Sequence, residues 1–128
     1  SGDGASRLTP PPALSICVPS RNRQFYFQET IRALVASARD DVEFVFADNS
    51  DEPAIMDGFM SGLSGDPRVR YLPSEAKPLS MVDNWERTMA VTAGRWVAFI
   101  GDDDYIDPET ADVIAAIEAR VPDVDAIA

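Results

Sequence analysis

Apolar and polar positions alternate along the chain in a way that predicts strands joined by helices. Short apolar runs with β-branched residues predict strands at residues 14–18, 42–47, 69–71 and 96–100. Apolar residues at helical spacing predict helices within residues 27–38, 54–63, 80–94 and 107–121. Residues 125–128 resemble the start of a fifth strand. Strands that alternate with amphipathic helices indicate an α/β fold with a largely parallel sheet flanked by helices.

Local signals mark the ends of these elements. Pro19 is expected to stop the first strand, and Asn22 is a candidate cap for the next helix. Ser80, with Asp83 three residues later, is a helix N-cap signature, and Gly94 is expected to end that helix. These signals support the boundaries that the periodicity suggests.

The helical spacing also predicts which side chains are buried. Trp85 and Met89 are expected in the core, whereas Arg87 and Arg95 are expected to be solvated. The last helix is expected to begin at Asp107 and Pro108 and to bury a stripe made of Val113, Ile114, Ile117 and Val121.

Polar clusters follow three of the predicted strands. They are residues 20–23 (Ser-Arg-Asn-Arg), 48–50 (Asp-Asn-Ser) and 102–104 (three aspartates). In open parallel sheets ligands bind outside the carboxyl ends of the strands. The sequence therefore predicts that the three clusters meet at one ligand-binding edge.

Three consecutive carboxylates at the mouth of a sheet require a physical reason. At about 5 Å, two unit charges repel by roughly 0.8 kcal/mol in water and by about 3 kcal/mol at an effective dielectric constant of about 20. A divalent cation, Mg²⁺ or Mn²⁺, removes this repulsion, and Mg²⁺ is commonly held by one or two carboxylates plus substrate phosphates. The alternative is a solvated turn with a capping carboxylate. An EF-hand calcium loop is excluded, because Ile106 and Asp107 stand where a ligand and a glycine are required.

The other two clusters each allow a structural and a functional interpretation. Asp48 is as well suited to capping a turn as to binding a ligand. Arg21 and Arg23 lie beside the strand end, where they could face a phosphate group.

Composition narrows the choice of partner. The chain has 128 residues, which indicates one domain, with residues 1–13 as a tail and residues 14–128 as the folded part. Its net charge of −11 argues against nucleic acid or an anionic membrane as a partner.

The chain has no histidine, and Cys17, its only cysteine, is expected to be a buried structural thiol. No apolar run approaches the length of a membrane-spanning helix, and no signal peptide is recognised.

The clusters and their flanking strands resemble family 2 glycosyltransferases, which have the Rossmann-like GT-A fold. The resemblance rests on residues 14–23, on residues 42–50, on Asn84 with residues 93–100, and on residues 101–104 followed by Pro108. It implies the nucleotide-sugar-binding half of a transferase that acts in bacterial polysaccharide biosynthesis. The expected location is the cytoplasm, at the inner face of the membrane for the full-length enzyme.

The resemblance also implies roles for individual residues. The nucleotide-binding residues would be Pro19, Ser20, Arg21, Asp48, Asn84 and Asp102, with Asp48 at the base, commonly uracil. Asp103 would bind Mn²⁺ or Mg²⁺, and Asp104 would assist it. The expected ligand is a nucleoside-diphosphate sugar, a UDP-sugar first, and the acceptor of the full enzyme would be a saccharide or a lipid-linked glycan.

Two features depart from the family pattern. Many relatives have an acid where this chain has Gly101, and no residue of the chain matches the catalytic base of the acceptor half. We therefore expect catalysis to need residues outside this chain, and we expect an exposed surface where an acceptor half would dock. The alternatives are a phospho-accepting receiver domain and a non-catalytic interaction domain on the same fold.

Overall fold

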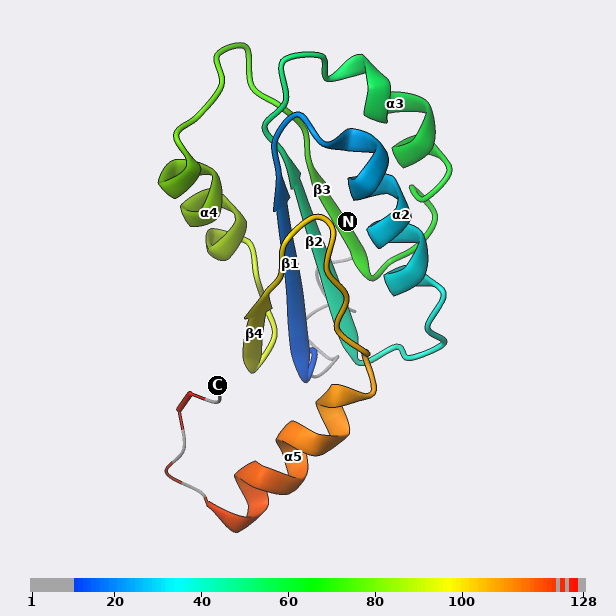
Figure 1. Cartoon of the computed structure of the whole chain (residues 1–128). Coiled ribbons are helices and arrows are strands. Elements are labelled where there is room, and N and C mark those ends of the chain that lie inside the picture. Colours follow the sequence, from blue (N-terminus) through cyan, green and yellow to red (C-terminus); the bar gives the residue numbers. More distant parts are fainter. Residues whose placement is uncertain (1–10, 122, 124, 127–128) are drawn as a thin grey trace, which may run out of the picture.

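A parallel four-stranded sheet with helices on both faces forms the centre of the fold (Figure 1). The computed structural model describes residues 11–121, 123, 125 and 126. The strands lie in the order β3-β2-β1-β4 and are β1 (Leu14–Ser20), β2 (Val42–Asp48), β3 (Val69–Leu72) and β4 (Trp96–Phe99). All three pairings are parallel, so the predicted α/β fold is confirmed.

The helices divide between the two faces of the sheet (Figure 1). They are α2 (Gln24–Val35), α3 (Ala54–Ser61), α4 (Met81–Ala90) and α5 (Thr110–Arg120). Helices α2 and α3 cover one face, α4 lies on the other, and α5 lies below the sheet in this view. Among the described residues, no helix is both long enough and apolar enough to cross a bilayer.

The core lies between the sheet and the helices α2 and α3. Phe27 meets Phe46 edge-on with ring centroids 6.1 Å apart, and Phe44 stacks on Phe46 at the same distance. All three rings are fully buried, as are Ile16 and Ile31 beside them. Burial of a side chain of this size is worth about 1.5–3 kcal/mol, so this face supplies most of the hydrophobic stabilisation.

The face under α4 instead contains a buried polar network. The hydroxyl of Ser15 donates to Glu43 at 2.7 Å, and Glu43 also accepts the Ala93 backbone N–H at 2.9 Å. Gly94 donates its N–H to Ser15, and a Cβ on Gly94 would lie 2.5 Å from the Ser15 Oγ. Gly94 was expected to end α4, but the helix ends at Ala90. The glycine is needed here because the chain passes against β1.

Pro19 does not stop β1, contrary to the expectation from sequence. The strand continues to Ser20, and Pro19 lies opposite Ala47 in the register. In a parallel strand, alternate residues bond to opposite neighbours. Cys17 bonds toward β4 through its carbonyl, so Pro19 faces that same side, beyond the last paired residue of β4. The missing N–H of the proline therefore costs no ladder hydrogen bond.

The prediction that Trp85 and Met89 are core residues is wrong. Trp85 is 45% exposed and Met89 is 49% exposed, and Trp85 stacks on Phe99 at 5.1 Å. The side of α4 that packs on the sheet consists of Asn84 and Thr88, which are buried. The apolar side of α4 is therefore an exposed surface next to β4, and it consists of Met81, Val82, Trp85 and Met89.

Helix α5 also differs from its prediction. It begins at Thr110 rather than at Pro108, and Val113 and Val121 are more than half exposed. Its apolar packing comes from Ala111, which is buried, and from Ile114. Polar contacts also join it to the rest of the domain: Arg39 pairs with Asp112 at 2.8 Å, and the indole of Trp96 donates to Glu118. Asp125 and Ala126 are not in a strand, and the rest of the predicted fifth strand lies outside the described residues.

The first ten residues of the predicted tail also lie outside the described residues. Nearer the fold, Ala13 donates its N–H to the carbonyl of Asp41 at 2.7 Å, and Pro12 accepts the N–H of Arg95 at 2.9 Å. The backbone hydrogen bonding of the domain therefore extends to Pro12.

Candidate functional site at the carboxyl edge of the sheet

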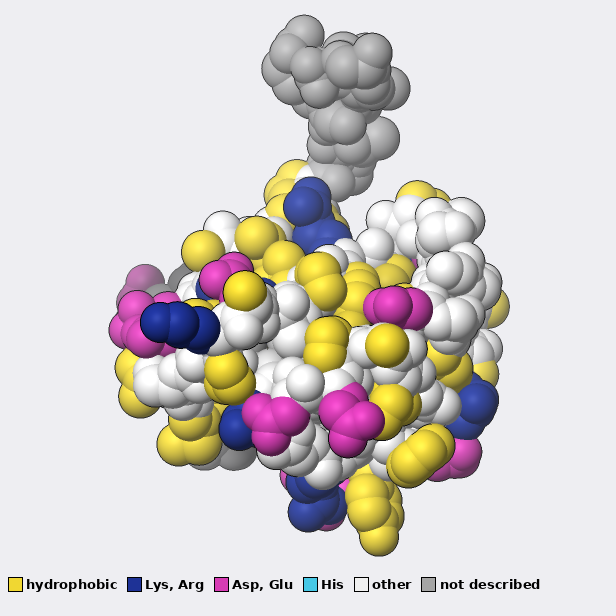
Figure 2. Space-filling model, turned by 90° about the horizontal axis from the view of Figure 1, so that it is seen from above, with side chains coloured by type: hydrophobic (Ala, Val, Ile, Leu, Met, Phe, Trp, Pro, Cys, Tyr) yellow, Lys and Arg dark blue, Asp and Glu magenta, His cyan; other side chains and the backbone are white. Residues whose placement is uncertain are grey.

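The three predicted polar clusters meet at the carboxyl edge of the sheet. Seen from above, this edge carries acidic, basic and apolar side chains close together (Figure 2). A pocket of about 390 Å³ opens here, lined by Pro19, Ser20, Arg21, Arg23, Asn49, Met81, Asn84, Trp85, Phe99, Ile100, Gly101 and Asp102. Five of the six predicted nucleotide-binding residues line it, and Asp48 does not. A larger hollow of about 600 Å³ lies along β4 and is mainly apolar.

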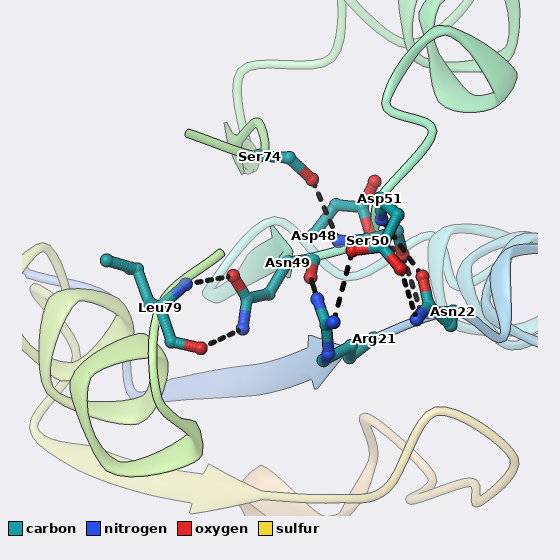
Figure 3. Close-up of polar contacts among 8 residues, drawn as sticks. All are labelled: Arg21, Asn22, Asp48, Asn49, Ser50, Asp51, Ser74 and Leu79. Atoms are coloured by element: carbon teal, nitrogen blue, oxygen red, sulfur yellow. Dashed lines mark hydrogen bonds and ion pairs between the residues drawn. The ribbon is translucent and has the colours of Figure 1, made fainter. Parts of the chain in front are cut away.

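The loops after β1 and β2 hold each other in place (Figure 3). Asn22 and Asp51 form two reciprocal hydrogen bonds, of 2.9 and 3.1 Å, and the N–H of Asn22 donates to Ser50. Asn22 adopts a positive φ of 57°, which asparagine tolerates better than most residues. It was a candidate helix cap, but the N-cap position belongs to Arg23. The guanidinium of Arg21 donates to the carbonyl of Asn49 and pairs with Asp51.

The β2 loop is also tied to the segment that leads into α4. Asn49 donates its amide to the carbonyl of Leu79 and accepts the Leu79 N–H, both at 2.8 Å (Figure 3). Ser50 donates its N–H to the hydroxyl of Ser74 at 2.9 Å. Ser80 caps α4 as predicted, because its hydroxyl accepts the N–H of Asp83. One wall of the pocket is therefore rigidly hydrogen-bonded before any ligand binds.

Asp48 lies behind this wall and is fully buried. Its carboxylate accepts hydrogen bonds from the hydroxyl of Ser50 at 2.5 Å and from the amide of Gln24 at 3.3 Å. Direct contact with a ligand would require this side chain to leave both partners.

The prediction that Arg87 is solvated is wrong, because this arginine supports the same edge of the sheet. It is only 18% exposed in its side chain, and burial lowers its pKa. It donates to the carbonyls of Asp48 at 2.6 Å and Pro73 at 2.9 Å, and to Asn84 Oδ1 at 2.8 Å. This arginine therefore connects the ends of β2 and β3 to the pocket side of α4. Its spacing of three residues from Asn84 was the available signal.

Asp102 is the fixed member of the acidic run. It is 8% exposed, its carboxylate accepts from Ser20 at 2.8 Å, and it pairs with the Nε of Arg23 at 3.0 Å. Its backbone carbonyl accepts the hydroxyl of Thr30 at 2.6 Å. The chain after β4 is thereby attached to both β1 and α2.

Asp103 and Asp104 are exposed, unlike Asp102. Asp103 is 54% exposed in its side chain and pairs with Arg23 at 2.9 Å. A Cβ at Gly101 would lie 3.3 Å from an oxygen of Asp103 and 3.0 Å from one of Asp104. Two carboxylates therefore gather in the space that the glycine leaves, and such oxygen donors suit Mg²⁺ or Mn²⁺. Within residues 11–121, 123, 125 and 126, no group of three potential metal ligands is gathered, and the Asp102 carboxylate is bonded to Ser20 and Arg23.

A parallel sheet whose carboxyl edge gathers carboxylates, arginines and amides around a pocket defines an α/β ligand-binding domain. The sequence profile of Glycosyl transferase family 2 matches residues 15–124, and the chain belongs to this family. Family membership removes the receiver-domain alternative.

Individual relatives agree with this assignment. EpsH of Bacillus subtilis (strain 168), which is named as a glycosyltransferase, is 26% identical over 98 residues, which are 77% of this chain and 28% of EpsH. The crystal structure of S. aureus TarS 1–349 superimposes with a TM-score of 0.67 at 20% identity, over 84% of this chain and 32% of that one. The mannosyltransferase PcManGT from Pyrobaculum calidifontis, in complex with GDP-Man and Mn²⁺, gives 0.65 at 16% identity, over 83% and 32%. These structures confirm the GT-A fold, and the chain spans about a third or less of each relative.

Proposed function

We propose that this chain is the donor-binding domain of a glycosyltransferase, which binds a nucleoside-diphosphate sugar through Mn²⁺ or Mg²⁺. The observation that carries the proposal is the pocket in which Ser20, Asn84 and Asp102 converge beside the exposed carboxylates of Asp103 and Asp104. The TarS structure with UDP-GlcNAc, at 19% identity and a TM-score of 0.66 over 84% of this chain and 31% of that one, supports a uridine nucleotide as the first candidate.

The residues divide into those that hold the nucleotide and those that hold the cation. Pro19, Ser20 and Arg21 flank the base, and Asn84 and Asp102 complete the nucleotide site. Asp48 keeps its proposed place at the base only if its buried carboxylate exchanges Ser50 and Gln24 for the ligand. Asp103 coordinates the cation with help from Asp104.

The cation, when bound, would neutralise the diphosphate and stabilise the nucleoside diphosphate as it departs. This charge compensation is needed because the chain carries a net charge of −11. An acceptor hydroxyl, of a saccharide or a lipid-linked glycan, would form the new bond to the anomeric carbon as the bond to the diphosphate oxygen breaks. The carboxylate that takes the hydroxyl proton would come from outside this chain.

A titration of UDP, GDP and dTDP with and without Mn²⁺ tests the proposal. We expect Mn²⁺-dependent binding by the wild type, loss of that binding in Asp103→Ala, and unchanged binding in Asp57→Ala. Asp57 is an exposed aspartate on α3, away from the pocket lining, so it controls for the loss of one negative charge. Absence of binding under every condition would favour a non-catalytic interaction domain instead.

The location of the enzyme is part of the proposal. Cys17 is buried and unpaired, so the described fold requires no oxidising compartment. This is consistent with the proposed cytoplasmic location, at the inner face of the membrane for the full-length enzyme.

A further inference from the structure

Arg23 is the cation that the domain itself supplies to the acidic run. Its Nε pairs with Asp102 at 3.0 Å and its Nη2 pairs with Asp103 at 2.9 Å. Among the ion pairs of residues 11–121, 123, 125 and 126, those of Arg23 alone reach these two carboxylates. The guanidinium also lies over the ring of Tyr26, 4.9 Å from its centroid, and it lines the pocket.

The two pairs of Arg23 differ in how easily they can be broken. Asp102 is almost buried and has a second partner in Ser20, so its pair with Nε belongs to the framework of the site. Asp103 is 54% exposed in its side chain, and an exposed pair is worth only about 0–1 kcal/mol. A ligand that competes for Asp103 therefore breaks the Nη2 pair and leaves the Nε pair intact.

We propose that Arg23 is a positioning residue that exchanges partners at this site. In the metal-free domain it holds the Asp103 carboxylate that the cation needs, and once the cation is bound its freed N–H groups turn to the diphosphate. This inference rests on the proposed function and adds to it a competition between guanidinium and metal for one carboxylate.

Three features make the exchange physically reasonable. The Nε pair with Asp102 and the contact with Tyr26 keep the guanidinium at the pocket after Asp103 is lost. Guanidinium groups bind phosphate oxygens through two parallel hydrogen bonds. The neighbouring Arg21 bonds to Asp51 and to the Asn49 carbonyl instead of the acidic run, so of these two arginines Arg23 is the one that holds a carboxylate of the proposed cation site.

The proposal predicts effects of opposite sign on the two ligands. In Arg23→Gln, Mn²⁺ alone should bind about two- to fivefold more tightly, because it no longer displaces an exposed ion pair. The same variant should bind a nucleoside diphosphate about tenfold more weakly at saturating Mn²⁺, because charge-assisted hydrogen bonds to phosphate are lost. A residue with a purely structural role would weaken both.

Electron paramagnetic resonance of free Mn²⁺ measures the first effect without any nucleotide, and calorimetry with UDP and GDP measures the second. Arg32→Gln is the matched control, because Arg32 loses the same charge from an exposed pair with Glu29 on the same helix. Arg23→Lys keeps the charge but cannot bridge two carboxylates, so we expect its Mn²⁺ affinity to lie between those of the wild type and Arg23→Gln.

The outcomes separate this inference from the proposed function. Tighter Mn²⁺ binding and weaker nucleotide binding in Arg23→Gln alone would support the exchange. Equal Mn²⁺ affinity in Arg23→Gln and Arg32→Gln, or weaker binding of both ligands, would overturn it. If the wild type binds Mn²⁺ but no nucleotide, the proposed function fails and so does the phosphate part of this inference. Undetectable Mn²⁺ binding by every protein would overturn both.

Discussion

Replacement of Arg87 by methionine tests how the carboxyl edge of the sheet is held together. The methionine keeps most of the apolar stem but removes the donors to the carbonyls of Asp48 and Pro73 and to the side chain of Asn84. Hydrogen bonds to a charged group contribute about 1.5–3 kcal/mol each, and they are not additive when one guanidinium supplies all of them. We therefore expect a loss of about 3–5 kcal/mol.

A loss of this size is a large part of the free energy of unfolding of a typical domain, which is about 5–15 kcal/mol. Urea unfolding followed by circular dichroism would measure it. Arg32→Met is the control, since Arg32 is 55% exposed in its side chain and pairs with an exposed Glu29; the expected loss is about 1 kcal/mol or less. Equal losses in the two variants would refute the bridging role that the structure assigns to Arg87.

Three further results are expected. Gly94→Ala should destabilise the domain by about 1–3 kcal/mol in urea unfolding, because its Cβ would meet the backbone of β1 at 2.6 Å. Gly58→Ala is the control and should not destabilise the domain, because a Cβ there has nothing within 4 Å; equal effects of the two substitutions would contradict the packing of Gly94 against β1. Nucleotide binding should change the fluorescence of Trp85, which lines the pocket, so the change should vanish in Trp85→Phe and persist in Trp96→Phe. Burial raises the pKa of Cys17 to about 12, so the thiol stays protonated at pH 8. It should therefore react with iodoacetamide only after the protein unfolds, and fast reaction of the native protein would contradict the burial of Cys17.

The fold could be predicted from the sequence because its strands are short runs of apolar, β-branched residues that end in polar clusters. β2 illustrates this: all seven of its residues are buried, and Asp48 marks its end. Parallel strands place such ends at one edge, which is why five of the six predicted nucleotide-binding residues line the pocket.

Features that depend on what packs against an element could not be predicted in this way. Trp85 and Met89 have the spacing of core residues, but α4 packs on the sheet with Asn84 and Thr88, because the sheet beneath it is partly polar at Ser15 and Glu43. Helical periodicity identifies an apolar stripe on a helix, but it does not tell whether that stripe or another side of the helix packs on the sheet.

Polar contacts between residues far apart in the sequence could not be predicted either. The exchange of hydrogen bonds between Asn22 and Asp51, and the pairing of Arg23 with Asp102, join residues that are 29 and 79 positions apart in sequence. Local rules gave Asn22 a role as a helix cap, because they contain no information about the β2 loop that lies beside it.

A crystal structure of the domain with Mn²⁺ and a nucleoside diphosphate would test the central claim most directly. The account predicts an anomalous-scattering peak for manganese at the Asp103 carboxylate, with the diphosphate in the pocket between Ser20 and Gly101. The absence of a manganese peak at Asp103, with Asp103 still paired to Arg23 and the nucleotide absent or bound elsewhere, would contradict this account.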